Sequence, residues 1–155
     1  MTSSDLQTQS NYQPTCFSLL KQQGPTCMIY ASAMLLGITP AQVVELTGYN
    51  GLGRRSHHPQ ELIDMARRLG KVLLPIERYP KCYTDGIEED VYNEIDADSR
   101  FGGYLRQNKG LLYGFKDGQA HMCAWNGQWV YDPHGYTVQI NDPRYKWTMF
   151  LLLVD

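Results

Sequence analysis

The chain has 155 residues, of which 43% are hydrophobic, and its charged side chains nearly balance to a net charge of −2. This length is enough for one domain with a buried core, but it leaves no room for a second domain of ordinary size. The near balance of charge argues against the strongly basic surface that nucleic-acid binding requires.

The N-terminal residues are polar and lack the apolar segment of a secretory signal peptide. We therefore expect a flexible segment over residues 1–13 and one folded domain over residues 14–155, in a cytoplasmic protein without a membrane partner. Delivery into another cell by a specialised secretion system is compatible with the same features. The cysteines show neither disulfide-scaffold nor CxxC spacing, which fits a reducing compartment; they are Cys16, Cys27, Cys82 and Cys123.

A cysteine stands at the start of the first predicted helix. Gly24-Pro25-Thr26 precedes Cys27, and the apolar run Met28 to Leu36 ends at Gly37. Since this helix is apolar nearly all round, we expect it inside the domain with only its N-terminus near solvent. The unpaired N–H groups and the helix dipole there favour thiolate over thiol, which would make Cys27 a nucleophile. Cys16, after a weaker Pro-Thr echo of this motif, is the rival nucleophile.

Two more helices and a strand are predicted next. Thr39-Pro40 begins a helix that ends by Gly48, with Thr as the N-cap and Pro at the first position. A further helix covers Pro59 to Leu69, and Val72 to Ile76 forms a short strand. The segment Tyr49 to His58 between the helices is interpreted as a surface loop. The functional alternative is that this loop contacts the substrate.

The second half of the chain changes from helical to strand patterning. Ile87, Val91 and Ile95 recur at helical spacing, and Tyr104-Leu105 belongs to another helix before Gly110. Strands are predicted at Leu111–Phe115, Ala120–Trp125, Gln128–Tyr131, Tyr136–Ile140 and Trp147–Val154. Helices followed by an antiparallel sheet indicate an α+β domain.

Asn126-Gly127 lies between two aromatic-rich runs and predicts a β-hairpin with a two-residue type I′ turn. With that turn His121 falls directly opposite Asp132, with Cβ atoms about 4.5–5.5 Å apart. A turn of another length would move this pairing. His121 would then serve as the general base for Cys27, and Asp132 would orient its imidazole. His134 is the rival base, although it falls in a predicted turn.

Two glutamines precede the cysteine. The side-chain amide of Gln22 or Gln23, together with the backbone N–H of Cys27, can donate to a developing oxyanion. A zinc site is a weaker alternative, because only the adjacent histidines of its candidate ligands approach ligand spacing; these ligands are Cys82, Cys123, His57 and His58.

Taken together, these residues resemble the papain-like cysteine peptidase superfamily, especially small bacterial members akin to bacteriocin-processing peptidases and the papain-fold toxin and protein-glutaminase groups. The matching residues are Gln22, Gly24, Thr26, Cys27, His121 and Asp132-Pro133. The resemblance implies a papain-like α+β fold, with a cysteine-bearing helix packed on an antiparallel sheet that carries the histidine and the acid. The family glutamine usually stands six residues before the cysteine, where this chain has Lys21. Gln22 is nearer to that position than Gln23.

We therefore predict a cysteine peptidase that acts on a protein or peptide substrate through Cys27, His121 and Asp132, with Gln22 at the oxyanion and without a cofactor or metal. Deamidation of a protein glutamine begins with the same attack and is the alternative function. A catalytically idle binding module on the same fold is the second alternative.

Overall fold

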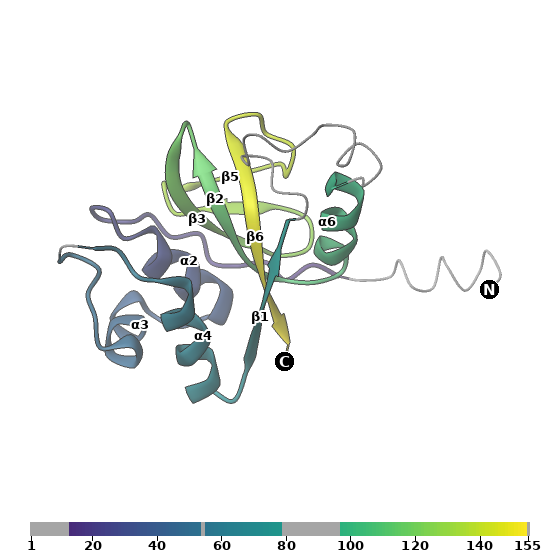
Figure 1. Cartoon of the computed structure of the whole chain (residues 1–155). Coiled ribbons are helices and arrows are strands. Elements are labelled where there is room, and N and C mark those ends of the chain that lie inside the picture. Colours follow the sequence, from purple (N-terminus) through teal and green to yellow (C-terminus); the bar gives the residue numbers. More distant parts are fainter. Residues whose placement is uncertain (1–12, 54, 79–96, 155) are drawn as a thin grey trace, which may run out of the picture.

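The computed structural model describes residues 13–53, 55–78 and 97–154. Its helices are α2 (Cys27–Leu36), α3 (Pro40–Thr47), α4 (Pro59–Arg68) and α6 (Ala97–Leu105). Its strands are β1 (Val72–Glu77), β2 (Gly110–Lys116), β3 (Gln119–Trp125), β4 (Val130–Asp132), β5 (Tyr136–Val138) and β6 (Tyr145–Val154). The predicted α+β class is confirmed (Figure 1). The predictions for residues 1–12 and for Ile87, Val91 and Ile95 lie outside the described residues.

The strands form one curled, antiparallel, six-stranded sheet in the order β1-β6-β2-β3-β4-β5 (Figure 1). Alternate side chains along β2 and β6 enter two different cores, because successive side chains of a strand point to opposite faces. The cross-strand pair Leu111 and Leu151 packs with α2, α3 and α4. The next pair, Leu112 and Phe150, packs with α6. Both faces of the sheet are therefore covered by helices.

Helix α2 is buried along most of its length, as its composition predicts. Seven of its ten residues are buried, and it ends at Gly37 in the left-handed conformation with a φ of 66°. Helix α3 begins with the predicted cap: the Thr39 side chain accepts from the Gln42 N–H, and the Gln42 side chain accepts from the Thr39 N–H. Among the described residues no single helix is long and apolar enough to cross a membrane.

The hairpin register differs from the prediction. Trp125 pairs with Val130 instead of Gln128, so the loop contains four residues, 126–129, and β4 begins later than predicted. Asn126 explains the longer loop, because its Oδ1 atom accepts the backbone N–H groups of both Gln128 and Trp129. This Asx-type turn closes the loop through a side chain, which the two-residue turn does not need. The prediction that His121 lies directly opposite Asp132 is therefore wrong.

Candidate active site

Cys27 is the first residue of α2 and lies half-buried on the wall of a cavity of about 610 Å³. The hydroxyl of Thr26, the residue before the helix, donates to the Gln23 carbonyl at 2.8 Å and does not cap the helix. Other walls of the cavity come from separate parts of the fold: Gln22, Ser56, His121 and His134. The loop before α4, predicted to be able to face substrate, thus reaches this cavity through Ser56.

His121 and Asp132 are in hydrogen-bond contact despite the altered register. The Nε2 atom of His121 lies 2.8 Å from Oδ1 of Asp132, and both side chains are buried. The loop is two residues longer than predicted, and a shift of two residues keeps each side chain on the same face of the sheet. His121 therefore becomes a diagonal neighbour of Asp132, which a long side chain can still reach.

The thiol of Cys27 lies close enough to the imidazole of His121 to influence its protonation. Burial alone would lower the pKa of His121, but hydrogen bonding and charge interactions with Asp132 and Cys27 raise it to about 9. Because Asp132 contacts Nε2, Nδ1 is the ring nitrogen left for the sulfur. The arrangement favours an imidazolium facing the sulfur at neutral pH.

Asp132 has three further partners that the sequence interpretation missed. Its Oδ2 atom accepts from Nζ of Lys116 at 2.8 Å and from the hydroxyl of Tyr145 at 2.5 Å. Its Oδ1 atom accepts from the backbone N–H of His134 at 2.8 Å. Burial would raise the pKa of Asp132, but the hydrogen bonds from His121, Lys116, Tyr145 and His134 lower it well below its ordinary value. The carboxylate is therefore charged and held from several sides.

Lys116 is a buried cation at the end of β2. Its ammonium group contacts Asp132, the hydroxyl of Tyr136 and, at 2.6 Å, Nδ1 of His134. Burial would lower the pKa of Lys116, but the hydrogen bonds to Asp132 and Tyr136 raise it. Strand alternation contains a signal for this residue: Lys116 has the same parity as the buried Leu112, and a charged residue on a buried face needs a partner.

His134, the rival base, lies beside His121. The two imidazole rings stack with centroids 4.5 Å apart, and the side chain of His134 remains 42% exposed. Its Nδ1 atom faces Lys116, and burial together with the positive charges of His121 and Lys116 lowers its pKa. His121, in contrast, interacts with both Cys27 and Asp132. The geometry therefore favours His121 as the base.

Gln22 lines the cavity, whereas Gln23 is exposed and is absent from its lining. The backbone N–H of Gln22 donates to the Pro133 carbonyl at 2.6 Å, which ties the loop before α2 to the segment that follows Asp132. The Nε2 atom of Gln22 donates to the Gly24 carbonyl at 2.7 Å. An amide nitrogen carries two hydrogens, so one remains for another acceptor.

The alternative zinc site is not assembled in the part of the chain that is described. His57 contacts the Thr47 hydroxyl at 3.1 Å, His58 caps α4, and Cys82 lies outside the described residues. A different trio, His121, Cys123 and Asp132, places its potential ligand atoms within 4.8 Å of one another. However, burial raises the pKa of Cys123 well above its ordinary value, and zinc requires the thiolate. These donors therefore fit a metal poorly.

Comparison of the chain with protein-family models, with curated proteins and with solved structures found no match. The function is therefore inferred from the geometry of Cys27, His121, Asp132 and their neighbours.

Proposed function

We propose that this chain is a papain-like cysteine hydrolase that attacks an amide bond of a peptide or protein. One observation carries the proposal: Cys27, at the start of a buried helix, shares a cavity with His121, whose far nitrogen is held by the buried Asp132. A nucleophile, a base and a group that orients the base are the parts that thiol hydrolysis requires. The contact of α2 with β3 supports the papain-like arrangement, since β3 carries His121.

In the proposed reaction, the Cys27 thiolate attacks the amide carbonyl carbon and forms a tetrahedral intermediate. The negative oxygen accepts hydrogen bonds from the Cys27 backbone N–H and the remaining amide hydrogen of Gln22. The imidazolium of His121 then gives its proton to the leaving nitrogen as the C–N bond breaks, which leaves a thioester on Cys27. His121 next removes a proton from water, the resulting hydroxide displaces the sulfur, and a carboxylic acid product is released.

Asp132 holds the imidazole in place during both steps and stabilises its protonated form. The other partners of Asp132 keep it charged in a buried position, so it does not compete for the proton of His121. Lys116 and Tyr145 are positioning residues in this proposal.

A peptidase is our first candidate, and a protein glutamine deamidase is the second. The same nucleophile, base and oxyanion donors would serve the second candidate equally well. Both reactions use the same thioester and differ in whether the leaving nitrogen belongs to the backbone or to ammonia. The free thiols of Cys16, Cys27 and Cys123 support a reducing, cytoplasmic location for either enzyme.

Mass spectrometry of candidate protein substrates, incubated with the wild-type chain or with Cys27→Ala, tests the proposal. New chain termini that depend on Cys27 indicate a peptidase. A mass gain of about one dalton on a glutamine, without chain scission, indicates a deamidase. Modification of substrates by Cys27→Ala at the wild-type rate would contradict the proposal, and Cys16→Ala is the matched control that should keep full activity.

Once a substrate is known, substitutions separate the role of His121 from the role of Asp132. His121→Ala should lower kcat/KM by about a thousandfold, because general acid-base transfer contributes about 10²–10⁴-fold. Asp132→Ala should cause a smaller loss, since it removes orientation and leaves the base in place. If His134→Ala abolishes activity and His121→Ala does not, the base is His134. A well-folded chain that modifies no substrate would favour the idle binding module.

A further inference from the structure

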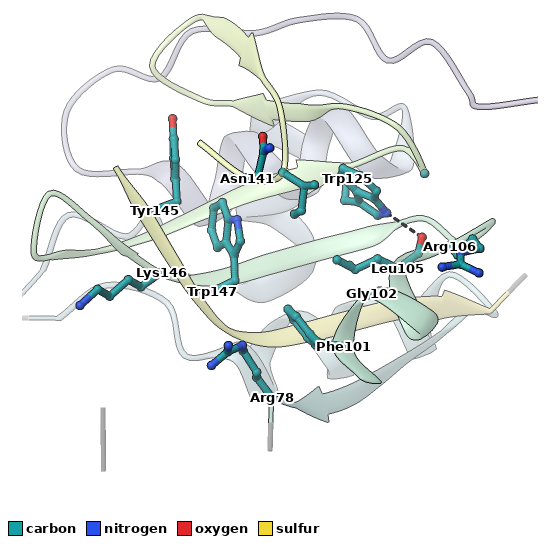
Figure 2. A pocket seen from close by; sticks show the side chains of 12 residues that line it. Arg78, Phe101, Gly102, Leu105, Arg106, Trp125, Asn141, Tyr145, Lys146 and Trp147 are labelled. Carbon is teal, nitrogen blue, oxygen red and sulfur yellow. Dashed lines mark hydrogen bonds between the residues drawn. The ribbon is translucent and has the colours of Figure 1, made fainter. Parts of the chain in front are cut away.

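A second cavity, of about 690 Å³, lies on the α6 side of the sheet (Figure 2). Among the described residues, its lining shares no member with the lining of the Cys27 cavity. Tyr145 lines this cavity and also donates to Asp132, but none of the other lining residues takes part in the proposed hydrolysis. Its size falls within the range of about 300–1,000 Å³ that is usual for small-molecule sites.

The floor of this cavity is apolar and mostly aromatic. Phe101 and Leu105 come from α6, Trp125 from β3 and Trp147 from β6, and all four are buried. The ring of Tyr145 stacks on Trp147 with centroids 5.0 Å apart. Figure 2 shows these side chains converging on one hollow from different elements. Such a surface favours a ligand with a large apolar body.

The charged residues of the cavity are all cations. Arg78, Arg106 and Lys146 line it, and its described lining contains no aspartate or glutamate. Figure 2 shows these three side chains at different sides of the apolar floor. Arg106 and Lys146 are exposed to solvent. Together they place a positive potential over an apolar hollow, which favours an anion.

One buried donor in the cavity lacks an acceptor. The indole Nε1 atom of Trp147 is buried and has no hydrogen-bond partner among the described residues. In contrast, the indole Nε1 of Trp125 donates to the Leu105 carbonyl at 2.9 Å. Figure 2 shows the Trp147 nitrogen on the ring edge turned toward Trp125, inside the hollow. Because an indole N–H can only donate, a ligand oxygen would satisfy it.

We propose that this cavity binds an organic carboxylate with a large apolar body. One carboxylate oxygen accepts the hydrogen bond from Nε1 of Trp147, and the positive potential of the cations around the cavity favours its negative charge. The apolar body packs on Trp125 and on the side chains from α6. The proposed ligand contacts use none of Cys27, His121, Asp132 and Gln22, so this proposal does not rest on the proposed hydrolase activity.

Decanoate is a suitable probe, with decanol as the matched neutral ligand. The tryptophan fluorescence of the full wild-type chain should change saturably with decanoate, because two tryptophans line the cavity. We expect decanol to bind about tenfold more weakly, because it offers no charge to the cations and the buried donor. Equal affinity for the two ligands, or no saturable change with decanoate, would overturn the proposal.

Variants locate the binding site. Lys146→Gln and Arg106→Gln change exposed side chains, and each should weaken decanoate binding severalfold without altering decanol binding. Trp147→Phe keeps an aromatic ring and removes the donor, so it should reduce the preference for decanoate over decanol. Arg67→Gln, on the exposed surface of α4, is the matched control and should bind as the wild type does.

A second binding experiment distinguishes a small carboxylate ligand from an acidic peptide ligand. A synthetic peptide with the acidic sequence of residues 84–96 presents several carboxylates and apolar side chains on one chain. If this peptide binds in the cavity and decanoate does not, the assignment to a small organic carboxylate is wrong. Retained decanoate binding in Lys146→Gln, Arg106→Gln and Trp147→Phe would place the ligand elsewhere and would also overturn the proposal.

Discussion

Asp132 accepts hydrogen bonds from His121, Lys116, Tyr145 and the backbone of His134. Here a buried cation shares its negative charge, so the imidazolium of His121 receives less electrostatic stabilisation than Asp132 alone would provide. We therefore expect Lys116 to lower the pKa of His121 while it helps to fix the position of Asp132.

Replacement of Lys116 with methionine tests this role. Lys116→Met keeps an unbranched apolar stem and removes the charge, so the pKa of His121 should rise above its wild-type value of about 9. Titration of the imidazole followed by NMR measures this pKa directly. Lys146→Met, an exposed lysine outside the Cys27 cavity, is the control and should leave the pKa unchanged. An unchanged or lowered pKa of His121 in Lys116→Met would refute the role.

Part of the candidate site was predictable from the sequence. Cys27 was recognisable because a glycine and a proline precede an apolar helix. His121 and Asp132 were recognisable because the Asn126-Gly127 turn signal lies between them and predicts that their strands pair. Lys116 and Tyr145 were not recognisable, because their contacts with Asp132 depend on how three strands curve toward one another. Strand parity identifies Lys116 as facing inward, but it does not identify the carboxylate that pairs with it.

Among the elements, β2 and β6 approach closely at a glycine. Their register shifts between Tyr113 and Gly114, and a Cβ atom on Gly114 would lie 2.0 Å from the Lys146 carbonyl oxygen. The pairing therefore requires a residue without a side chain at this point. The same strand carries Lys116 two residues later, so this contact also helps to place the partner of Asp132.

Gly114→Ala should destabilise the fold by about 3 kcal/mol or more, because the clash is with backbone atoms that cannot rotate away. Urea unfolding measures the loss. Gly103→Ala is the matched control: Gly103 lies in α6 with nothing within 4 Å of an added Cβ atom, and the change should be neutral or stabilising by up to about 1 kcal/mol. Equal stabilities for the two variants would contradict this view of the β2–β6 contact.

The elements themselves were largely predictable, whereas the hairpin register was not. The helices beginning at Cys27, Pro40 and Pro59 follow from apolar patterning with proline and glycine boundaries, and the structure confirms them. The register depended on the side chain of Asn126. Its Oδ1 atom accepts hydrogen bonds from two backbone N–H groups, which gives a four-residue loop where a two-residue turn was predicted. The contact between His121 and Asp132 survived the error because strand periodicity is two residues.

For the whole molecule, the site links stability to pH through two groups with opposite shifts. The pKa of His121 is raised from 6.5 to about 9, so its contribution to stability is complete below pH 6.5 and is lost as the pH rises through about 9. The pKa of Asp132 is lowered from 3.8, so its contribution is present above that value and is lost in acid.

The melting temperature of the wild-type chain should therefore fall between pH 6.5 and about pH 9. Asp132→Asn removes the main charge that raises the pKa of His121, so the melting temperature of this variant should fall less over the same range. Differential scanning calorimetry measures both curves. A steeper fall in Asp132→Asn than in the wild type would show that the linkage has another origin.

If Cys27 is an activated nucleophile paired with His121, the rate of alkylation at each cysteine of the native chain should show it. With iodoacetamide near neutral pH and peptide mass spectrometry, Cys27 should react about tenfold faster than Cys16, Cys82 or Cys123, because an unactivated thiol is only a few per cent thiolate at this pH. His121→Ala should remove this advantage and leave the rate at Cys16 unchanged. Faster labelling of Cys16, equal rates at all four cysteines, or an unaltered rate at Cys27 in His121→Ala would contradict the account.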